Sequence, residues 1–292
     1  MNRRDLLKTV GAVAGSTLVA RKLEAQEAAG SEPDTMAILV DTTLCVGCQS
    51  CEYACVDAHK DAGLEVPEDV DISVERPTSE KQWTVVNRYE TEKGEVFRKT
   101  QCMHCLTPAC ASACLTKAMH KTPAGPVAWD VDRCMGCRFC MVSCPFDVPK
   151  FEYDSPVPRI QKCTMCWDRV SEGGVPACVE ACPTGALTFG KRSELLDEAR
   201  DRIYHAPDQY LHHIYGENEA GGTGYLYLAS VPFEQLGLRT YLADEPYPVY
   251  TREFLYGVPV VLTLVPPLLV ALHRASKERS VLPSESRKED ER

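Results

Sequence analysis

Residues 134–145 read Cys-Met-Gly-Cys-Arg-Phe-Cys-Met-Val-Ser-Cys-Pro, a short run that contains four cysteines. Three further groups of four lie elsewhere in the chain of 292 residues, and together the groups account for all 16 cysteines. A [4Fe-4S] cluster takes one thiolate per iron, so this number of cysteines suffices for four clusters. In chain order the quartets are Cys45/Cys48/Cys51/Cys55 (quartet 1), Cys102/Cys105/Cys110/Cys114 (quartet 2), Cys134/Cys137/Cys140/Cys144 (quartet 3) and Cys163/Cys166/Cys178/Cys182 (quartet 4).

The spacing inside the quartets indicates iron–sulfur ligation. Quartets 1 and 3 follow C-x2-C-x2-C-x3-C, the bacterial ferredoxin pattern, in which the fourth cysteine ligates a neighbouring cluster. Quartet 2 widens the middle interval to four residues and quartet 4 widens it to eleven. Both keep the opening C-x2-C and the closing C-x3-C, so all four quartets predict [4Fe-4S] clusters.

Zinc and disulfide bonds are the alternative uses of so many cysteines. Zinc sites also employ C-x2-C pairs, but usually as two pairs separated by a longer loop, where a third cysteine two residues on has no place. Disulfides suit an exported protein, yet bridges among three such closely spaced cysteines would be strained. The chain has no C-x-x-C-H sequence, so covalent c-type haem is not indicated.

The two ends of the chain carry targeting signals. Residues 1–28 begin with Arg3-Arg4, followed by an apolar run over 9–20, and resemble a twin-arginine export signal. Residues 254–272, FLYGVPVVLTLVPPLLVAL, contain no charge and are long enough for one transmembrane helix. Pro266 and Pro267 should kink this helix. The basic residues that follow it place the charged tail, 273–292, in the cytoplasm and the body outside.

The rest of the sequence favours a metal-dependent body over a catalyst or a nucleic-acid binder. The net charge of −10 argues against nucleic-acid binding, and no Gly-rich phosphate loop is found. A four-cluster body is expected over 36–192, with a helix that begins near Ser193 as N-cap and an extended belt completing 193–253. Short helices should follow the fourth cysteine of each quartet. Strands are expected at 37–40, 83–89, 95–98, 127–130, 186–189 and 225–228, with a hairpin turn at 92–94.

Four polar residues lie close to the cysteines. His104 is inside quartet 2, where a hydrogen bond or exposure to solvent is expected in place of iron ligation, because sixteen thiolates already suffice. Lys117, Arg138 and Lys162 would either raise the potential of a nearby cluster electrostatically or be ordinary surface charges, and the sequence does not distinguish the two.

The four cysteine motifs, among them Cys45-Val-Gly-Cys48 and Gln101-Cys102-Met-His-Cys105, resemble those of four-cluster electron-transfer subunits of membrane oxidoreductases. Such subunits accompany molybdopterin enzymes of the dimethyl-sulfoxide-reductase type and some nickel–iron hydrogenases. The iron–sulfur subunit of the hydrogenase-2 type is most similar, through its twin-arginine start, the stretches at 214–219 and 231–234, and the single C-terminal helix. The beta subunit of formate dehydrogenase resembles the chain nearly as well.

This resemblance implies an α+β fold of two nested ferredoxin-like modules and a pairing of the cysteines that spacing alone leaves open. The implied ligand sets are Cys45, Cys48, Cys51 and Cys182 (site 1); Cys55, Cys163, Cys166 and Cys178 (site 2); Cys102, Cys105, Cys110 and Cys144 (site 3); and Cys114, Cys134, Cys137 and Cys140 (site 4).

The resemblance also implies a function. The chain would be a non-catalytic electron conduit between an extracytoplasmic catalytic subunit, a nickel–iron hydrogenase first, and an integral membrane partner that reacts with quinone. Other partners are a formate dehydrogenase or a polysulfide or nitrite reductase. A zinc-rich, membrane-anchored adaptor is the alternative from another class.

Overall fold

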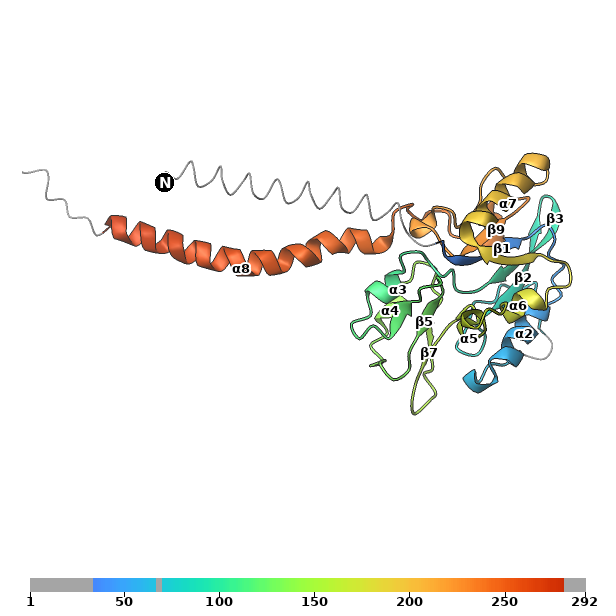
Figure 1. Ribbon diagram of the computed structural model, residues 1–292, viewed down its shortest axis with the longest axis horizontal. Coiled ribbons are helices and arrows are strands. Elements are labelled where there is room, and N and C mark those ends of the chain that lie inside the picture. The colour runs from blue at the N-terminus through green and yellow to red at the C-terminus, as the bar shows by residue number, and fades with distance from the viewer. Residues whose placement is uncertain (1–33, 67–69, 281–292) are drawn as a thin grey trace, which may run out of the picture.

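The computed structural model of the chain describes residues 34–66 and 70–280 (Figure 1). The expected export signal, 1–28, lies outside these residues, as does the end of the charged tail, 281–292. The described chain forms a body of small sheets and short helices, from which one long helix extends (Figure 1).

A three-stranded sheet organises one side of the body. Strand β1 (Met36–Asp41) pairs antiparallel with β8 (Leu187–Lys191) and parallel with β9 (Tyr225–Leu228). Alternate residues of β1 enter different clusters of buried side chains, Ile38 on one face and Leu39 on the other. Both faces of this strand are therefore covered, which explains why it reads as a continuous apolar run.

The other strands of the described residues form three two-stranded sheets. They are β2 (Val85–Thr91) with β3 (Gly94–Thr100), β4 (Met119–Lys121) with β5 (Val127–Trp129), and β6 (Lys150–Phe151) with β7 (Ile160–Gln161). The six expected strands and the turn at 92–94 are confirmed, whereas β4, β6 and β7 were not expected from the sequence. The last two strands are only two residues long, too short for an alternating pattern.

The short helices lie at the cysteines, but not where the sequence placed them. They are α2 (Ser50–Ala58), α3 (Ala109–Ser112), α4 (Phe139–Ser143), α5 (Trp167–Ser171) and α6 (Ala177–Glu180). The expectation that a helix follows each fourth cysteine is wrong, since α2, α3, α4 and α6 each contain the third cysteine of a quartet. The third and fourth cysteines are four residues apart, and only α2 is long enough to contain both members of its pair, Cys51 and Cys55. Helix α2 contacts α6, and α3 contacts α4.

Helix α7 (Arg192–His205) covers the outer face of the three-stranded sheet through Leu195, Leu196 and Ala199. The helix was expected, but its N-cap is Lys191 rather than Ser193. The Ser193 backbone N–H instead donates to Asp34 Oδ1 over 3.1 Å. The Asp34 carboxylate, 159 residues away in sequence, therefore caps the first turn, which local sequence could not indicate.

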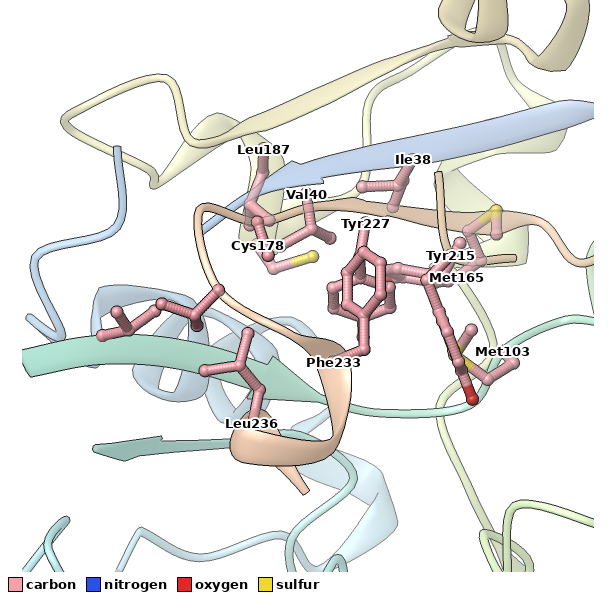
Figure 2. Packing of buried hydrophobic residues seen from close by; sticks show 14 residues of the cluster. Ile38, Val40, Met103, Met165, Cys178, Leu187, Tyr215, Tyr227, Phe233 and Leu236 are labelled. Carbon is pink, nitrogen blue, oxygen red and sulfur yellow. The ribbon is translucent and has the colours of Figure 1, made fainter. Parts of the chain in front are cut away.

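The segment after α7 is part of the core. Figure 2 shows Tyr215, Tyr227 and Phe233 packed beneath the sheet, and Cys178 lies in the same cluster of buried side chains. This segment contains the 3-10 turns η2 (Glu219–Gly221) and η3 (Phe233–Leu236), and a further 3-10 turn, η1 (Lys60–Ala62), follows α2. The tyrosines are fully buried, so this segment packs against the cysteine-bearing helices.

Helix α8 (Tyr247–Ser280) leaves the body next to α3 (Figure 1). Within residues 247–274, the most apolar 18-residue stretch has a mean hydropathy of 2.1 and is not buried in the body. Three prolines, Pro259, Pro266 and Pro267, lie inside it. The helix is long and apolar enough to cross a membrane.

Candidate metal centres: four cysteine sites

The ligand loops of quartets 1 and 3 share one backbone conformation. Gly47 and Gly136 both have φ of +69°, and the residues that follow the second cysteine, Gln49 and Arg138, have φ of +59° and +61°. Left-handed residues turn successive backbone N–H groups toward one concavity, an arrangement suited to an anionic group. In Gly47 a side chain is also excluded sterically, because a Cβ there would lie 2.4 Å from Phe97 Cδ1.

Two cavities are lined by cysteines from both ends of the body. One is lined by Cys45, Cys48 and Cys51 of quartet 1 together with Cys182. A second is lined by Cys55 together with three cysteines of quartet 4, namely Cys163, Cys166 and Cys178. Pairing of β1 with β8 and packing of α2 on α6 bring these quartets together. The cysteine groupings at these cavities are those of sites 1 and 2.

The remaining cysteines lie near one another in two more groups. Burial raises the pKa of the Cys105 thiol well above 9.0, and the thiolates of Cys102, Cys144 and Cys110 raise it further. Burial also raises the pKa of Cys140 to about 11, with further contributions from its neighbours Cys134, Cys114 and Cys137. These neighbours are the members of sites 3 and 4, contributed by quartets 2 and 3 through the contact of α3 with α4.

The donor set fits iron–sulfur clusters. All sixteen cysteines are free of disulfide bonds. In the described residues, 34–66 and 70–280, no three His, Cys, Asp or Glu side chains gather closely enough to hold a single metal ion. The sulfurs of sites 1 and 2 line cavities instead, as needed for a group that is larger than one ion. Burial raises the pKa of most of these thiols in the metal-free chain, but bound iron would keep them deprotonated.

Backbone N–H groups point at several cysteine sulfurs. Met119 N lies 3.3 Å from Cys114 Sγ, and Ala177 N lies 3.4 Å from Cys166 Sγ. Hydrogen bonds of this kind stabilise a thiolate and raise the potential of an iron–sulfur cluster. These two N–H groups, one five residues after Cys114 and one at the start of α6, are therefore placed to stabilise the thiolates of Cys114 and Cys166.

The four sites form a row whose ends are exposed. Cys48 of site 1 and Cys137 of site 4 are exposed, whereas all four cysteines of site 2 are buried. Successive sites are close enough for their thiolates to repel one another. The interacting pairs are Cys51 with Cys178, Cys102 with Cys163, and Cys110 with Cys140. The order along the row is thus 1, 2, 3, 4.

Two of the polar residues singled out in the sequence are buried. His104 Nδ1 accepts a hydrogen bond of 2.8 Å from Val127 N–H, so the expected hydrogen bond is confirmed and solvent exposure is excluded. Burial and three nearby lysines lower the pKa of His104 well below 6.5, which keeps the ring neutral. Lys162 is also buried, and its charge partly offsets the burial that raises the pKa of Cys102 and of Cys110 in site 3.

The other two, Lys117 and Arg138, are exposed. The guanidinium of Arg138 lies 5.3 Å from the centroid of the Phe151 ring, where it makes a cation–π contact. Water screens both charges, so they correspond to the surface-charge interpretation.

Lys99 is a site residue that the sequence did not reveal. It lies on β3, is 2% exposed, and lines both the site 1 and the site 2 cavities. A lysine in a strand of mixed polarity normally points to solvent, and only the packing of the β2–β3 hairpin on the cysteine loops turns this one inward.

Comparison with known proteins agrees with this geometry. Residues 95–192 match the model of the 4Fe-4S dicluster domain family. The chain is 38% identical over 286 residues to the hydrogenase-2 operon protein HybA of Escherichia coli O157:H7, covering 82% of this chain and 84% of that protein. The chain belongs to this family of iron–sulfur subunits.

Two further relatives align over different lengths of the chain. A protein of Nitratidesulfovibrio vulgaris is 44% identical over 299 residues, covering 99% of this chain and 80% of its own. The nitrate-inducible formate dehydrogenase iron–sulfur subunit of Escherichia coli K12 is 37% identical over 202 residues, covering 66% of this chain and 67% of its own. The family resemblance read from the cysteine motifs is therefore confirmed.

Proposed function

We propose that the protein is an electron-transfer subunit that holds four [4Fe-4S] clusters and relays electrons between a catalytic subunit and a quinone-reactive membrane partner. The proposed ligands are the cysteines of sites 1 to 4 as defined above. The observation that carries this proposal is the pair of cavities at which cysteines from distant parts of the chain meet. When bound, each cluster accepts and donates one electron.

The arrangement of the cysteines supports two nested ferredoxin-like modules. Quartets 1 and 4 would form one module around β1, α2, α6 and β8, and quartets 2 and 3 would form the other around α3 and α4. Residues 36–192 would then be the four-cluster body, with 193–253 completing its sheet and core. The chain itself supplies thiolates, backbone N–H groups and buried cations, and we assign it no catalytic residue.

The position of α8 supports a direction for the row of sites. Helix α8 contacts α3, which carries Cys110 of site 3 and packs beside α4. Sites 3 and 4 therefore lie on the side from which the membrane segment, 254–272, departs. We propose that the membrane partner docks near the exposed Cys137, and the catalytic subunit near the exposed Cys48.

The location follows from the proposed signals at the two ends. A twin-arginine signal over 1–28 would export the folded, cluster-loaded body. Arg274 and Lys277, which follow the apolar stretch, would keep the tail, 273–292, in the cytoplasm. The body would then face the periplasmic or extracytoplasmic side of the cytoplasmic membrane.

A nickel–iron hydrogenase is the catalytic partner that we propose first. The relative named for hydrogenase-2 aligns with 82% of this chain, whereas the formate dehydrogenase subunit aligns with 66%. Purification of the complex from native membranes, followed by assays with hydrogen and with formate, separates the two partners. Formate-dependent dye reduction without hydrogen-dependent activity would replace the hydrogenase with a formate dehydrogenase.

Metal analysis tests the number of clusters. Protein purified without oxygen should contain about sixteen irons and as many acid-labile sulfides, four of each per cluster. Stoichiometric zinc with little iron would reject the electron-transfer function and favour the adaptor.

Cysteine variants test the ligand sets. Cys182→Ala and Cys45→Ala should remove the same centre from the electron paramagnetic resonance spectrum of the reduced protein, and Cys144→Ala should remove another. A shared centre for Cys45 and Cys55 would show that the modules are not nested in this way.

A further inference from the structure

Lys99 is a buried cation that donates a hydrogen bond to a neutral amide. Its side chain extends from β3 and is 2% exposed. Nζ donates a hydrogen bond of 3.0 Å to Gln101 Oε1 and lies 5.4 Å from the centroid of the Tyr225 ring. Within residues 34–66 and 70–280, no aspartate or glutamate forms an ion pair with Lys99. A buried ammonium is costly unless negative charge lies nearby.

The negative charge that faces Lys99 comes from two cysteine sites. The side chain lines the cavity of site 1 and also the cavity of site 2. Burial by itself would lower the pKa of Lys99, but the thiolates of Cys178, Cys51 and Cys163 raise it and outweigh burial. The first and third of these belong to site 2 and the second to site 1, so the ammonium is shared by both.

A closed ring of hydrogen bonds holds the lysine in this position. Gln101 Nε2 donates to Tyr227 Oη over 2.7 Å, and Tyr227 Oη donates to the Lys99 carbonyl over 2.9 Å. Together with the bond from Nζ to Gln101, these contacts link the backbone and the tip of Lys99 to one fully buried tyrosine. The charge therefore has little freedom to move away from the two sites.

We propose that Lys99 is a fixed buried cation that raises the reduction potentials of the clusters at sites 1 and 2 together, and so keeps that pair matched for electron exchange. The proposal rests on the proposed function, since it requires clusters at both sites. A positive charge stabilises the reduced, more negative form of each cluster, and low polarity around it prevents screening. Lys162, which is buried beside Cys102 of site 3 and donates to the Cys163 carbonyl of site 2 over 3.0 Å, offers a comparison residue that does not line the cavity of site 1.

The test is a redox titration of the cluster-loaded protein, followed by electron paramagnetic resonance, with centres assigned through the cysteine variants. Lys99→Met should lower the midpoint potentials of centres 1 and 2. For each centre, the equilibrium constant for reduction should fall by about tenfold or more. Lys99→Arg, which keeps the positive charge, should retain the wild-type potentials of centres 1 and 2. The potentials of centres 3 and 4 should not change in either variant. Lys162→Met should lower the potential of centre 3 and leave that of centre 1 unchanged, and Lys117→Met, at an exposed lysine, should change none.

Two results would overturn the role of Lys99. One is a Lys99→Met protein that has full iron and unchanged potentials, and the other is an equal shift in Lys99→Arg. If Lys99→Met loads less iron, Lys99→Gln, which is neutral but polar, is titrated in its place with the same expectations. A wild-type protein with fewer than four reducible centres would contradict the proposed function itself, which is distinguishable from intact centres that ignore Lys99.

Discussion

The buried ion pair between Arg76 and Glu52 should determine how firmly α2 is held. Glu52 follows Cys51 on α2, and its side chain is 1% exposed. Its carboxylate accepts bonds of 2.8 and 3.3 Å from the two terminal nitrogens of Arg76 and one of 2.6 Å from Val86 N–H. Helix α2 carries ligands of sites 1 and 2. The bond from Val86 to Glu52 therefore attaches both sites to the β2–β3 hairpin.

Replacing Arg76 by Met should leave the Glu52 carboxylate buried with one hydrogen bond. Removing one partner of a buried pair costs about 3–5 kcal/mol. The Arg76 side chain is 16% exposed, so water can reach part of the site and about 3 kcal/mol is expected. If the contact is already broken in the transition state for unfolding, the unfolding rate should rise about 100-fold, because 1.4 kcal/mol corresponds to a factor of ten.

The assay is the rate of cluster loss in denaturant, followed by the visible absorbance of the iron–sulfur protein. The matched control is Lys81→Met, which breaks a pair with Glu65 whose side chains are 57% and 65% exposed. That change should alter the free energy barrier by less than about 1 kcal/mol. Combining Arg76→Met with Glu52→Gln should recover much of the loss. An Arg76→Met protein that loses clusters no faster than the Lys81→Met control would refute the reasoning.

Three further outcomes are expected. Gly47→Ala should lower the iron content, because its Cβ would meet Phe97 at 2.4 Å, whereas Gly136→Ala, with the same φ but its nearest atom at 3.9 Å, should retain more iron by metal analysis. Burial would raise the pKa of Glu152, but hydrogen bonds from Gln161 and Arg159 lower it below 4.5. Its stabilising contribution is thus present above that pH and lost as the pH falls through the lowered pKa. Below pH 4.5 the rate of cluster loss should therefore rise less steeply with falling pH in Glu152→Gln than in the wild-type protein. A chain truncated before α8 and expressed without partners should fractionate with soluble protein, and continued sedimentation with membranes would show another anchor.

Much of the fold could be read from local patterns. The apolar run in 37–40 gave β1, the alternation on either side of 92–94 gave the β2–β3 hairpin, and the spacing of Leu196 and Ala199 gave α7. These elements have a periodic pattern of apolar side chains, which indicates the type of secondary structure from local sequence. The short helices contain the third cysteine of each quartet, whereas they were expected after the fourth. Helices of four residues have little stability of their own, so the surrounding cysteine loops determine where they form.

The sequence by itself indicated the chemistry of the sites, because the thiolates of its quartets have the spacing typical of iron–sulfur ligation. Tertiary structure decided which cysteines meet, since Cys45 and Cys182 share a cavity only after β1 pairs with β8. It also decided which cations matter. Lys99 and Lys162 are buried, while Lys117 remains in water, and the strength of a charge depends on the surrounding solvent, which no linear pattern records.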